Sequence, residues 1–398
     1  MAWGTADLEA RRWLGRKLEA TGLTVEVDAA LNVFGRTANA RRPRLLVGSH
    51  TDSVPAGGRL DGAFGVVAAL EVVRTLAEAG DPAVGHVELV DFADEEGVRF
   101  PCGYFGAKAL TGALNVDALA AATNAKEVLS RAGVDIGAVT TAGGRLPDVA
   151  GYLELHIEQG PRLEAEGLGV AVVPGILGFD RYRITIEGRS AHGGTTPFEL
   201  RHDPVRAAAV FIAEVPAIVR AVDEAGVATV GNASSDGGAI NFVAQKVAFT
   251  LEVRQPAIDA LARAVDALQA RLREVCRANE CQASMTRHDL VAEAKDGVQL
   301  AVEPAFAAPV AFDTRLVDAV EAACVDAEVA HRRMHAGTWH DAAILARHVP
   351  AAMMLVASRG GVTHSPAEAT SDADLVDGAR VLLRAARNAV RVLGLLDT

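Results

Sequence analysis

Polar residues of the kinds that bind metal ions follow short apolar runs that have the character of buried strands. The run RLLVGSH ends at His50, YLELHI contains His156, and HVELVDF is followed within a few residues by Glu96. Segments with helical periodicity separate these runs, as from Val66 to Ala79. Alternating strands and helices predict an α/β fold with an open, mostly parallel sheet and a site at the carboxyl ends of its strands.

The middle of the chain has a different pattern. RYRITIEG and KVAFTLEVR alternate apolar and polar residues with period two, and each precedes a long helical segment. This order is typical of a smaller α+β domain whose sheet is covered on one face. We expect it at residues 179–300, inserted into a metal-binding domain formed by residues 1–178 and 301–398.

Charge and composition restrict the partners and the compartment. The 398 residues carry a net charge of -12, and their lysines and arginines form no dense run, which argues against nucleic acid and anionic membrane as partners. The four cysteines show no C-x-x-C spacing, and no segment has the character of a signal peptide or a membrane span. A cytoplasmic protein is expected.

Five residues have the chemistry of a binuclear metal site, namely His50, Asp61, Glu96, His156 and His364. Imidazoles and carboxylates are the ligands that divalent ions use in hydrolases, and a pair of ions needs a carboxylate that reaches both. Asp61 lies in a glycine-rich turn eleven residues after His50, so it can fold back to the same place. We therefore predict Asp61 as the bridging ligand.

Adjacent carboxylates in the segment ADEEG suggest two different roles. Glu95 and Glu96 cannot both face one point of an extended backbone, so we assign Glu96 as a ligand and Glu95 as the general base. Asp52, two residues after His50, is expected to hydrogen-bond the imidazole through its carboxylate. Taken singly, each residue also suits a strand end or a solvated turn, but together, among glycines and apolar strands, they favour a metal site.

The segments GSHTDSV, GGRLDG, DEEGVRF, ELHIEQGP, HGGTTP, GGAINFVAQKVAFTLEVR and THSPAE occur in an order that resembles the M20-type binuclear amidohydrolases. The short step from His50 to Asp61 and the histidine of HIEQG resemble the hydantoinase/carbamoylase branch in particular. The resemblance covers nearly the whole chain. It implies a zinc-peptidase-like catalytic domain holding two divalent ions (Zn, Mn, Co or Ni), and a homodimer formed through an inserted lid domain.

The resemblance also implies residues that act on the substrate. His192 matches a lid histidine that stabilises the tetrahedral intermediate in the site of a partner subunit. The residues implied to bind substrate are Gln159, Asn241, Arg254, His340 and Gly361. Arg254 could instead be a surface cation, and His192 a loop residue. Trp339 departs from the family pattern, which has a small residue there.

The implied reaction is hydrolysis of the ureido group of a small carboxylate substrate. An N-carbamoyl-L-amino acid is the expected substrate, which gives the amino acid, CO2 and ammonia. Allantoate and N-carbamoyl-β-alanine carry the same groups and remain alternatives, as do an aminoacylase or dipeptidase activity and a metal-binding protein without catalysis. The sequence shows no G-x-S-x-G elbow or nucleotide fingerprint.

Overall fold

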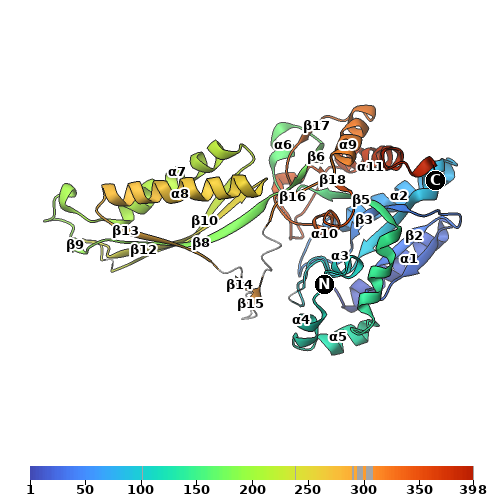
Figure 1. Ribbon diagram of the computed structural model, residues 1–398, viewed down its shortest axis with the longest axis horizontal. Helices are drawn as coiled ribbons and strands as arrows, with labels where there is room; N and C mark the ends of the chain where they lie inside the picture. The colour runs from blue at the N-terminus through green and yellow to red at the C-terminus, as the bar shows by residue number, and fades with distance from the viewer. Residues whose placement is uncertain (101, 238, 289–290, 294–298, 302–307, 398) are drawn as a thin grey trace. The chain divides into compact units, whose positions relative to one another are not determined.

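The chain divides into two compact units. The computed structural model describes residues 1–100, 102–237, 239–288, 291–293, 299–301 and 308–397. The first unit is Met1–Gly175 with Ala311–Thr398, and the second is Ile176–Val310 (Figure 1). The segment that we expected to form an insertion, residues 179–300, falls within the second unit.

An eight-stranded sheet in the order β1-β2-β4-β3-β5-β18-β6-β17 forms the centre of the first unit. Its strands are β1 (Thr24–Val27), β2 (Val33–Arg36), β3 (Arg44–His50), β4 (Val87–Phe92), β5 (Val149–Ile157), β6 (Val170–Val173), β17 (His331–Arg333) and β18 (Ala351–Val356). The four neighbours β4, β3, β5 and β18 run parallel, while β1, β2 and β6 pair antiparallel with a neighbour. The predicted α/β fold with a largely parallel sheet is confirmed.

Helices cover both faces of this sheet. The helices of the first unit are α1 (Thr5–Ala20), α2 (Ala63–Glu78), α3 (Phe105–Thr111), α4 (Val116–Ala121), α5 (Ala125–Ala132), α6 (Arg162–Glu166), α9 (Thr314–Asp326), α10 (Asp341–Leu345) and α11 (Asp372–Val392), with 3-10 turns η1 (Pro82–His86), η2 (Val139–Asp148), η5 (Arg359–Gly361) and η6 (Leu395–Asp397). Neighbouring residues of a strand point to opposite faces. Leu155 of β5 faces α11, whereas Glu154 accepts a hydrogen bond from the backbone of α10, so these two helices lie on opposite faces.

Burial on both faces explains why the central strands are apolar runs rather than alternating ones. Every residue of β3, β4 and β18 is buried. The polar residues that complete these strands therefore lie at one edge, because parallel strands place their carboxyl ends together. His50 is the last residue of β3, and His156 is the last but one of β5.

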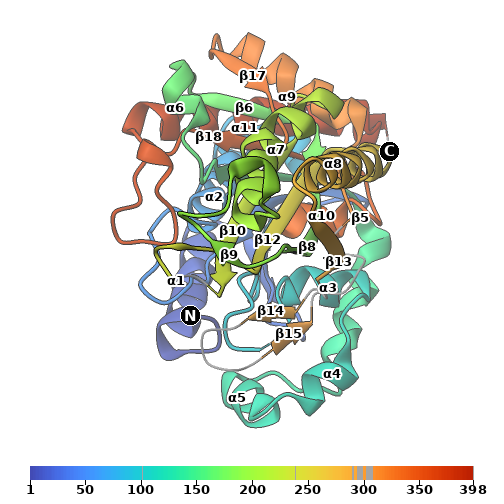
Figure 2. The same cartoon turned by 90° about the vertical axis from the view of Figure 1, so that its left-hand side faces the viewer.

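The second unit is a four-stranded antiparallel sheet with two helices. The sheet order is β10-β12-β8-β13, and Figures 1 and 2 show α7 and α8 on one face of it. The elements are β8 (Gly178–Glu187), β9 (Ala191–His192), η3 (Phe198–Leu200), α7 (Pro204–Val222), β10 (Val227–Asp236), β11 (Phe242–Val243), β12 (Lys246–Gln255), α8 (Ile258–Ala278), β13 (Gln282–Arg287), β14 (Val291–Glu293) and β15 (Gln299–Ala301). Two further short strands are β7 (Gly175–Ile176) and β16 (Val310–Ala311).

Burial alternates strictly along β12, where every second side chain faces the helices. Phe211 of α7 and Phe249 of β12 pack with their ring centroids 6.0 Å apart in this core. The period-two pattern of the sequence thus reflects a sheet with one covered face. Among the described residues, no helix is both long enough and apolar enough to cross a membrane.

Candidate metal centre

Asp61 lies between two groups of metal-ligand atoms in the first unit. One group is His50, Asp61 and His156, the other is Asp61, Glu96 and His364, and within each group the ligand atoms are all within 4.8 Å of one another. Asp61 Oδ1 is 3.0 Å from His156 Nε2, while Oδ2 is 3.2 Å from His364 Nε2. The two oxygens of one carboxylate therefore face different groups, which is the arrangement a bridging ligand needs.

Gly62 allows the turn that carries Asp61 to approach β3. A Cβ atom at position 62 would lie 2.4 Å from the ring of His50, and the backbone φ of +64° also favours glycine. The glycine after Asp61 in the segment GGRLDG is thus explained by close approach. A larger residue at position 62 would force the His50 ring or this turn to shift.

Hydrogen bonds to backbone carbonyls orient the two buried imidazoles. His50 Nδ1 is 3.1 Å from the carbonyl oxygen of Asp52, and His156 Nδ1 is 3.0 Å from that of Ile157. A ring nitrogen that faces a carbonyl oxygen must carry the hydrogen and donate it. Burial lowers the pKa of His50, so its ring is neutral and Nε2 keeps a lone pair directed at the centre.

Two buried polar atoms of the centre have no hydrogen-bond partner among the described residues. They are Nε2 of His50 and Oε1 of Glu96. Buried polar atoms are normally satisfied, so atoms of this kind in a cluster of ligand residues indicate a missing positive partner. The residues present therefore fit divalent metal ions.

The prediction for the Asp52 carboxylate is wrong. Its Oδ1 lies 3.7 Å from His50 Nδ1, and the backbone carbonyl of Asp52 orients the ring instead. The reason is that β3 ends at His50, so the alternation of strand side chains does not extend to residue 52. The carboxylate accepts the backbone N–H groups of Glu95 at 3.1 Å and Glu96 at 3.3 Å, and so shapes the turn that bears both acids.

The two adjacent glutamates lie beside different ligand groups. Glu95 Oε2 is 3.8 Å from His50 Nε2, and Glu96 Oε2 is 3.7 Å from His364 Nε2. Burial, followed by the charge of Asp341, raises the pKa of Glu95 well above its ordinary value. Burial and then Asp61 raise the pKa of Glu96 to about 7. A cluster of buried carboxylates is costly without nearby positive charge, which metal ions would supply.

A pocket of 210 Å³ opens onto the centre. Its lining residues are Asp61, Glu95, Glu96, Gly103, Tyr104, Gln159, Thr338, Trp339, His340 and His364. Gln159 Nε2 donates to Asp61 Oδ2 at 2.9 Å. The ring centroids of His340 and His156 are 4.3 Å apart. Trp339 is buried in the wall of the pocket, and its ring centroid is 6.5 Å from that of Tyr104. Gln159 and His340, both predicted to contact substrate, thus lie together at this pocket.

The remaining predicted substrate residues belong to other segments of the chain. Gly361 ends η5 beside Pro161, where a Cβ atom would come within 2.7 Å of the proline nitrogen. His192, Asn241 and Arg254 belong to the second unit. His192 Nδ1 accepts backbone N–H groups at 3.1 and 3.2 Å, which leaves Nε2 as a donor when the ring is neutral. Arg254 Nε donates to Glu252 Oε1 at 2.7 Å. The functional roles of these residues stay predictions.

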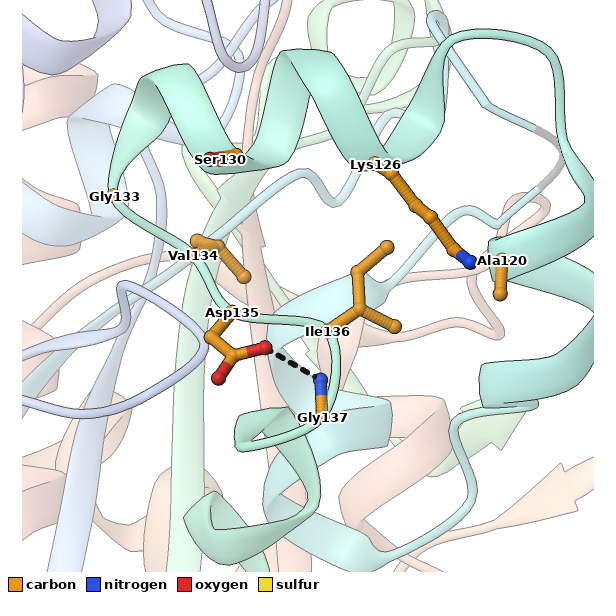
Figure 3. Close-up of a pocket in the computed structure, with 8 residues that line it drawn as sticks. All are labelled: Ala120, Lys126, Ser130, Gly133, Val134, Asp135, Ile136 and Gly137. Atoms are coloured by element: carbon orange, nitrogen blue, oxygen red, sulfur yellow. Dashed lines mark hydrogen bonds between the residues drawn. The ribbon is translucent and has the colours of Figure 1, made fainter.

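A larger hollow of 590 Å³ in the first unit lies beside α5 (Figure 3). Its walls include the ionisable residues Lys126 and Asp135, and Asp135 Oδ1 already accepts the backbone N–H of Gly137 at 2.9 Å. No predicted ligand lines it. The smaller pocket at Asp61 is therefore the candidate site.

Arg11 of α1 is buried beside the strand that leads to the centre. The sequence pattern did not predict this role. Arg11 Nη1 is 3.0 Å from Asp91 Oδ2, its Nε is 3.1 Å from Asp7 Oδ1, and its Nη2 donates to the carbonyl of Phe92 at 2.9 Å. Trp3 Nε1 likewise donates to Asp94 Oδ2 at 2.8 Å. The amino-terminal segment thus contacts the residues that lead into Glu95.

Replacing Arg11 with methionine should lower the free energy of unfolding by about 3–5 kcal/mol, because the buried carboxylates of Asp7 and Asp91 lose their cation. Urea unfolding followed by circular dichroism measures the loss. Arg12→Met changes an exposed position of the same helix and should shift stability by no more than about 0.5 kcal/mol. Equal effects of the two changes would contradict a buried ion network.

Comparison with known proteins shows the family of this chain. The family model described as "Peptidase family M20/M25/M40" matches residues 46–388. An N-carbamoyl-L-amino-acid amidohydrolase from Paenarthrobacter aurescens is 34% identical, with 94% of this chain and 89% of that protein covered. An allantoate amidohydrolase from Escherichia coli (strain K12) is 31% identical, with 94% and 89% covered.

A solved structure is similar over nearly the whole chain. It is an amidase of the hydantoinase/carbamoylase family from Burkholderia multivorans, 30% identical, with 98% of this chain and 92% of that chain covered and a TM-score of 0.81. The resemblance predicted from the sequence motifs is confirmed. Because the family model spans most of the chain, this protein belongs to peptidase family M20/M25/M40, whose members are metal-dependent hydrolases.

Proposed function

We propose that this protein hydrolyses the ureido group of N-carbamoyl-L-amino acids and releases the amino acid, CO2 and ammonia. The observation that carries the proposal is the position of Asp61, whose two oxygens face separate ligand groups at the floor of a pocket. An N-carbamoyl-L-amino-acid amidohydrolase among the relatives supports the choice of substrate.

The five predicted ligands would hold two divalent ions. His50, Asp61 and His156 would bind one, and Asp61, Glu96 and His364 the other. Imidazole and carboxylate donors suit Zn, Mn, Co and Ni. When bound, such ions act as Lewis acids towards a carbonyl group and lower the pKa of water.

Glu95 is the proposed general base. It lines the pocket beside His50 but lies outside both ligand groups, so its carboxylate is available to exchange protons. It would take a proton from the attacking water and deliver it to the nitrogen that leaves as the amine of the amino acid. The carbamic acid released in this step then decomposes to CO2 and ammonia.

Other residues of the pocket orient the substrate. Gln159 Nε2 donates to Asp61, so its side chain would fix the carboxylate, and its carbonyl oxygen could accept a ureido N–H group. Burial lowers the pKa of His340 well below its ordinary value, and a neutral ring can donate or accept one hydrogen bond.

The second unit would supply the remaining contacts. His192, with Nδ1 occupied by two backbone N–H groups, is suited to donate from Nε2 to a developing oxyanion. Arg254, aligned by Glu252, would bind the substrate carboxylate together with Asn241. We further propose that the protein is a homodimer formed through this unit.

A substrate panel tests the proposal. Purified protein loaded with Zn, Mn, Co or Ni is given N-carbamoyl-L- and D-amino acids, N-carbamoyl-β-alanine, allantoate and N-acetyl-L-amino acids, and the amine and ammonia released are measured. We expect the highest kcat/KM for an N-carbamoyl-L-amino acid. A higher kcat/KM for allantoate would make allantoate the substrate in place of an N-carbamoyl-L-amino acid. Allantoate is the substrate in the name of a relative with 31% identity. Release from N-acetyl compounds alone would refute ureido hydrolysis.

A further inference from the structure

Glu368 holds the turn that presents Asp61, although the two residues are 307 positions apart. Its Oε1 accepts the backbone N–H of Leu60 at 2.9 Å and that of Asp61 at 3.1 Å. The side chain is buried, with 5% of the residue exposed. We propose that Glu368 is a positioning residue that fixes the bridging carboxylate of the metal centre. This inference rests on the proposed metal ligands.

The second oxygen of Glu368 reaches the Asp61 side chain through Thr363. Thr363 Oγ1 lies 3.3 Å from Glu368 Oε2 and 3.3 Å from Asp61 Oδ2. Glu368 thus constrains both the backbone and the carboxylate of Asp61. Because one carboxylate serves both ligand groups, a shift of this single turn would disturb both ions together.

The glycine-rich turn is built around the same carboxylate. A Cβ atom at Gly58 would lie 2.0 Å from Glu368 Oε1, so no side chain fits there while Glu368 keeps its position. The backbone of Gly58 does not have a positive φ, so close approach alone explains the glycine. Residues 58 and 368 therefore give two independent ways to break one contact.

Removing the carboxylate would leave two buried N–H groups without an acceptor. Such groups cost free energy, and the turn would rearrange to satisfy them. Glutamine can keep the native geometry, because its carbonyl oxygen can replace Oε1 and its amide can donate to Thr363 Oγ1. The role assigned to Glu368 is hydrogen-bond acceptance, and it does not depend on contact with substrate.

The test measures metal binding without substrate. Metal-free wild type, Glu368→Ala, Glu368→Gln and Gly58→Ala are titrated with Zn²⁺ or Mn²⁺ in competition with a chelating dye, which gives stoichiometry and affinity. We expect Glu368→Ala and Gly58→Ala to bind about 10- to 100-fold more weakly, as is typical when a partner of a metal ligand is lost. Glu368→Gln should bind like the wild type.

Asp313→Ala is the matched control. Asp313 also accepts two backbone N–H groups, from Arg315 at 3.0 Å and Leu316 at 3.4 Å, at the start of α9 in the same unit. It should leave metal affinity unchanged. The proposal is overturned if Glu368→Ala folds and binds metal like the wild type, or if Glu368→Gln is as weak as Glu368→Ala.

The test also covers a variant that does not fold and a failure of the proposed function. If Glu368→Ala does not fold, the metal affinity of Gly58→Ala tests the proposal. The methyl group that this substitution adds would displace the Glu368 carboxylate without removing it. If the wild type binds two ions but cleaves no ureido substrate, the proposed function fails while the role of Glu368 is still decided by the titration.

Discussion

Replacing Glu95 with glutamine should lower kcat for N-carbamoyl-L-amino acids by about 10²- to 10⁴-fold, the usual contribution of a general base. Glutamine has the same size as glutamate, so the buried site should keep its shape, but an amide cannot accept the proton of water. Because Glu95 lies outside both ligand groups, the variant should still bind two metal ions. Amino-acid release at saturating substrate measures kcat.

Glu78→Gln serves as the control, since Glu78 lies on the exposed end of α2 and pairs with Arg74 at the surface. It should leave kcat unchanged. A Glu95→Gln variant that binds two ions and turns over at the wild-type rate would remove Glu95 from the mechanism. Loss of metal binding in that variant would instead make Glu95 a ligand.

The sequence predicted those parts of the centre that follow from strand periodicity. His50 and His156 lie at the carboxyl ends of neighbouring parallel strands, and a parallel sheet places such ends at one edge. Glu96 follows β4, the strand on the other side of β3, so its proximity follows from the same rule. Candidate ligands at the ends of apolar runs therefore predict side chains that lie close together in a parallel sheet.

The residues that support the centre could not be predicted in this way. Arg11 occupies a charged stretch of α1, and only the packing of that helix shows that its guanidinium is buried. Glu368 accepts hydrogen bonds from backbone N–H groups, one of them 307 residues away in the chain. Every residue except proline has such a group, so the identity of the partner residue does not reveal the contact. The spacing of Asp52 predicts a contact with His50, but β3 ends at His50 and the carboxylate accepts the backbone N–H groups of Glu95 and Glu96 instead.

Two glycines near Asp61 show what a sequence pattern can and cannot predict. The sequence predicts that Gly58 and Gly62 belong to a turn that can bring Asp61 back to His50. In the structure each has a specific neighbour, the ring of His50 for Gly62 and the carboxylate of Glu368 for Gly58. The sequence alone predicts a tight turn. The structure is needed to identify the atom that leaves no room for a side chain at each glycine.

Asp61→Ala should abolish the binding of both metal ions, whereas His364→Ala should abolish only one. The reason is that Asp61 belongs to both ligand groups, while His364 belongs only to the group that contains Glu96. Metal content after dialysis against buffered Zn²⁺ or Mn²⁺, determined by elemental analysis, should fall from about two ions per chain to none and to about one, respectively, as expected for a shared and an unshared ligand.

Thermal unfolding provides an independent check on the same difference. A ligand that binds only the folded state stabilises it, by about 2.7 kcal/mol at one hundred times Kd. Added metal should therefore raise the Tm of the wild type strongly, that of His364→Ala less, and that of Asp61→Ala hardly at all. Two ions retained by Asp61→Ala would refute the bridging role, because the two groups would then be filled without the one carboxylate that joins them.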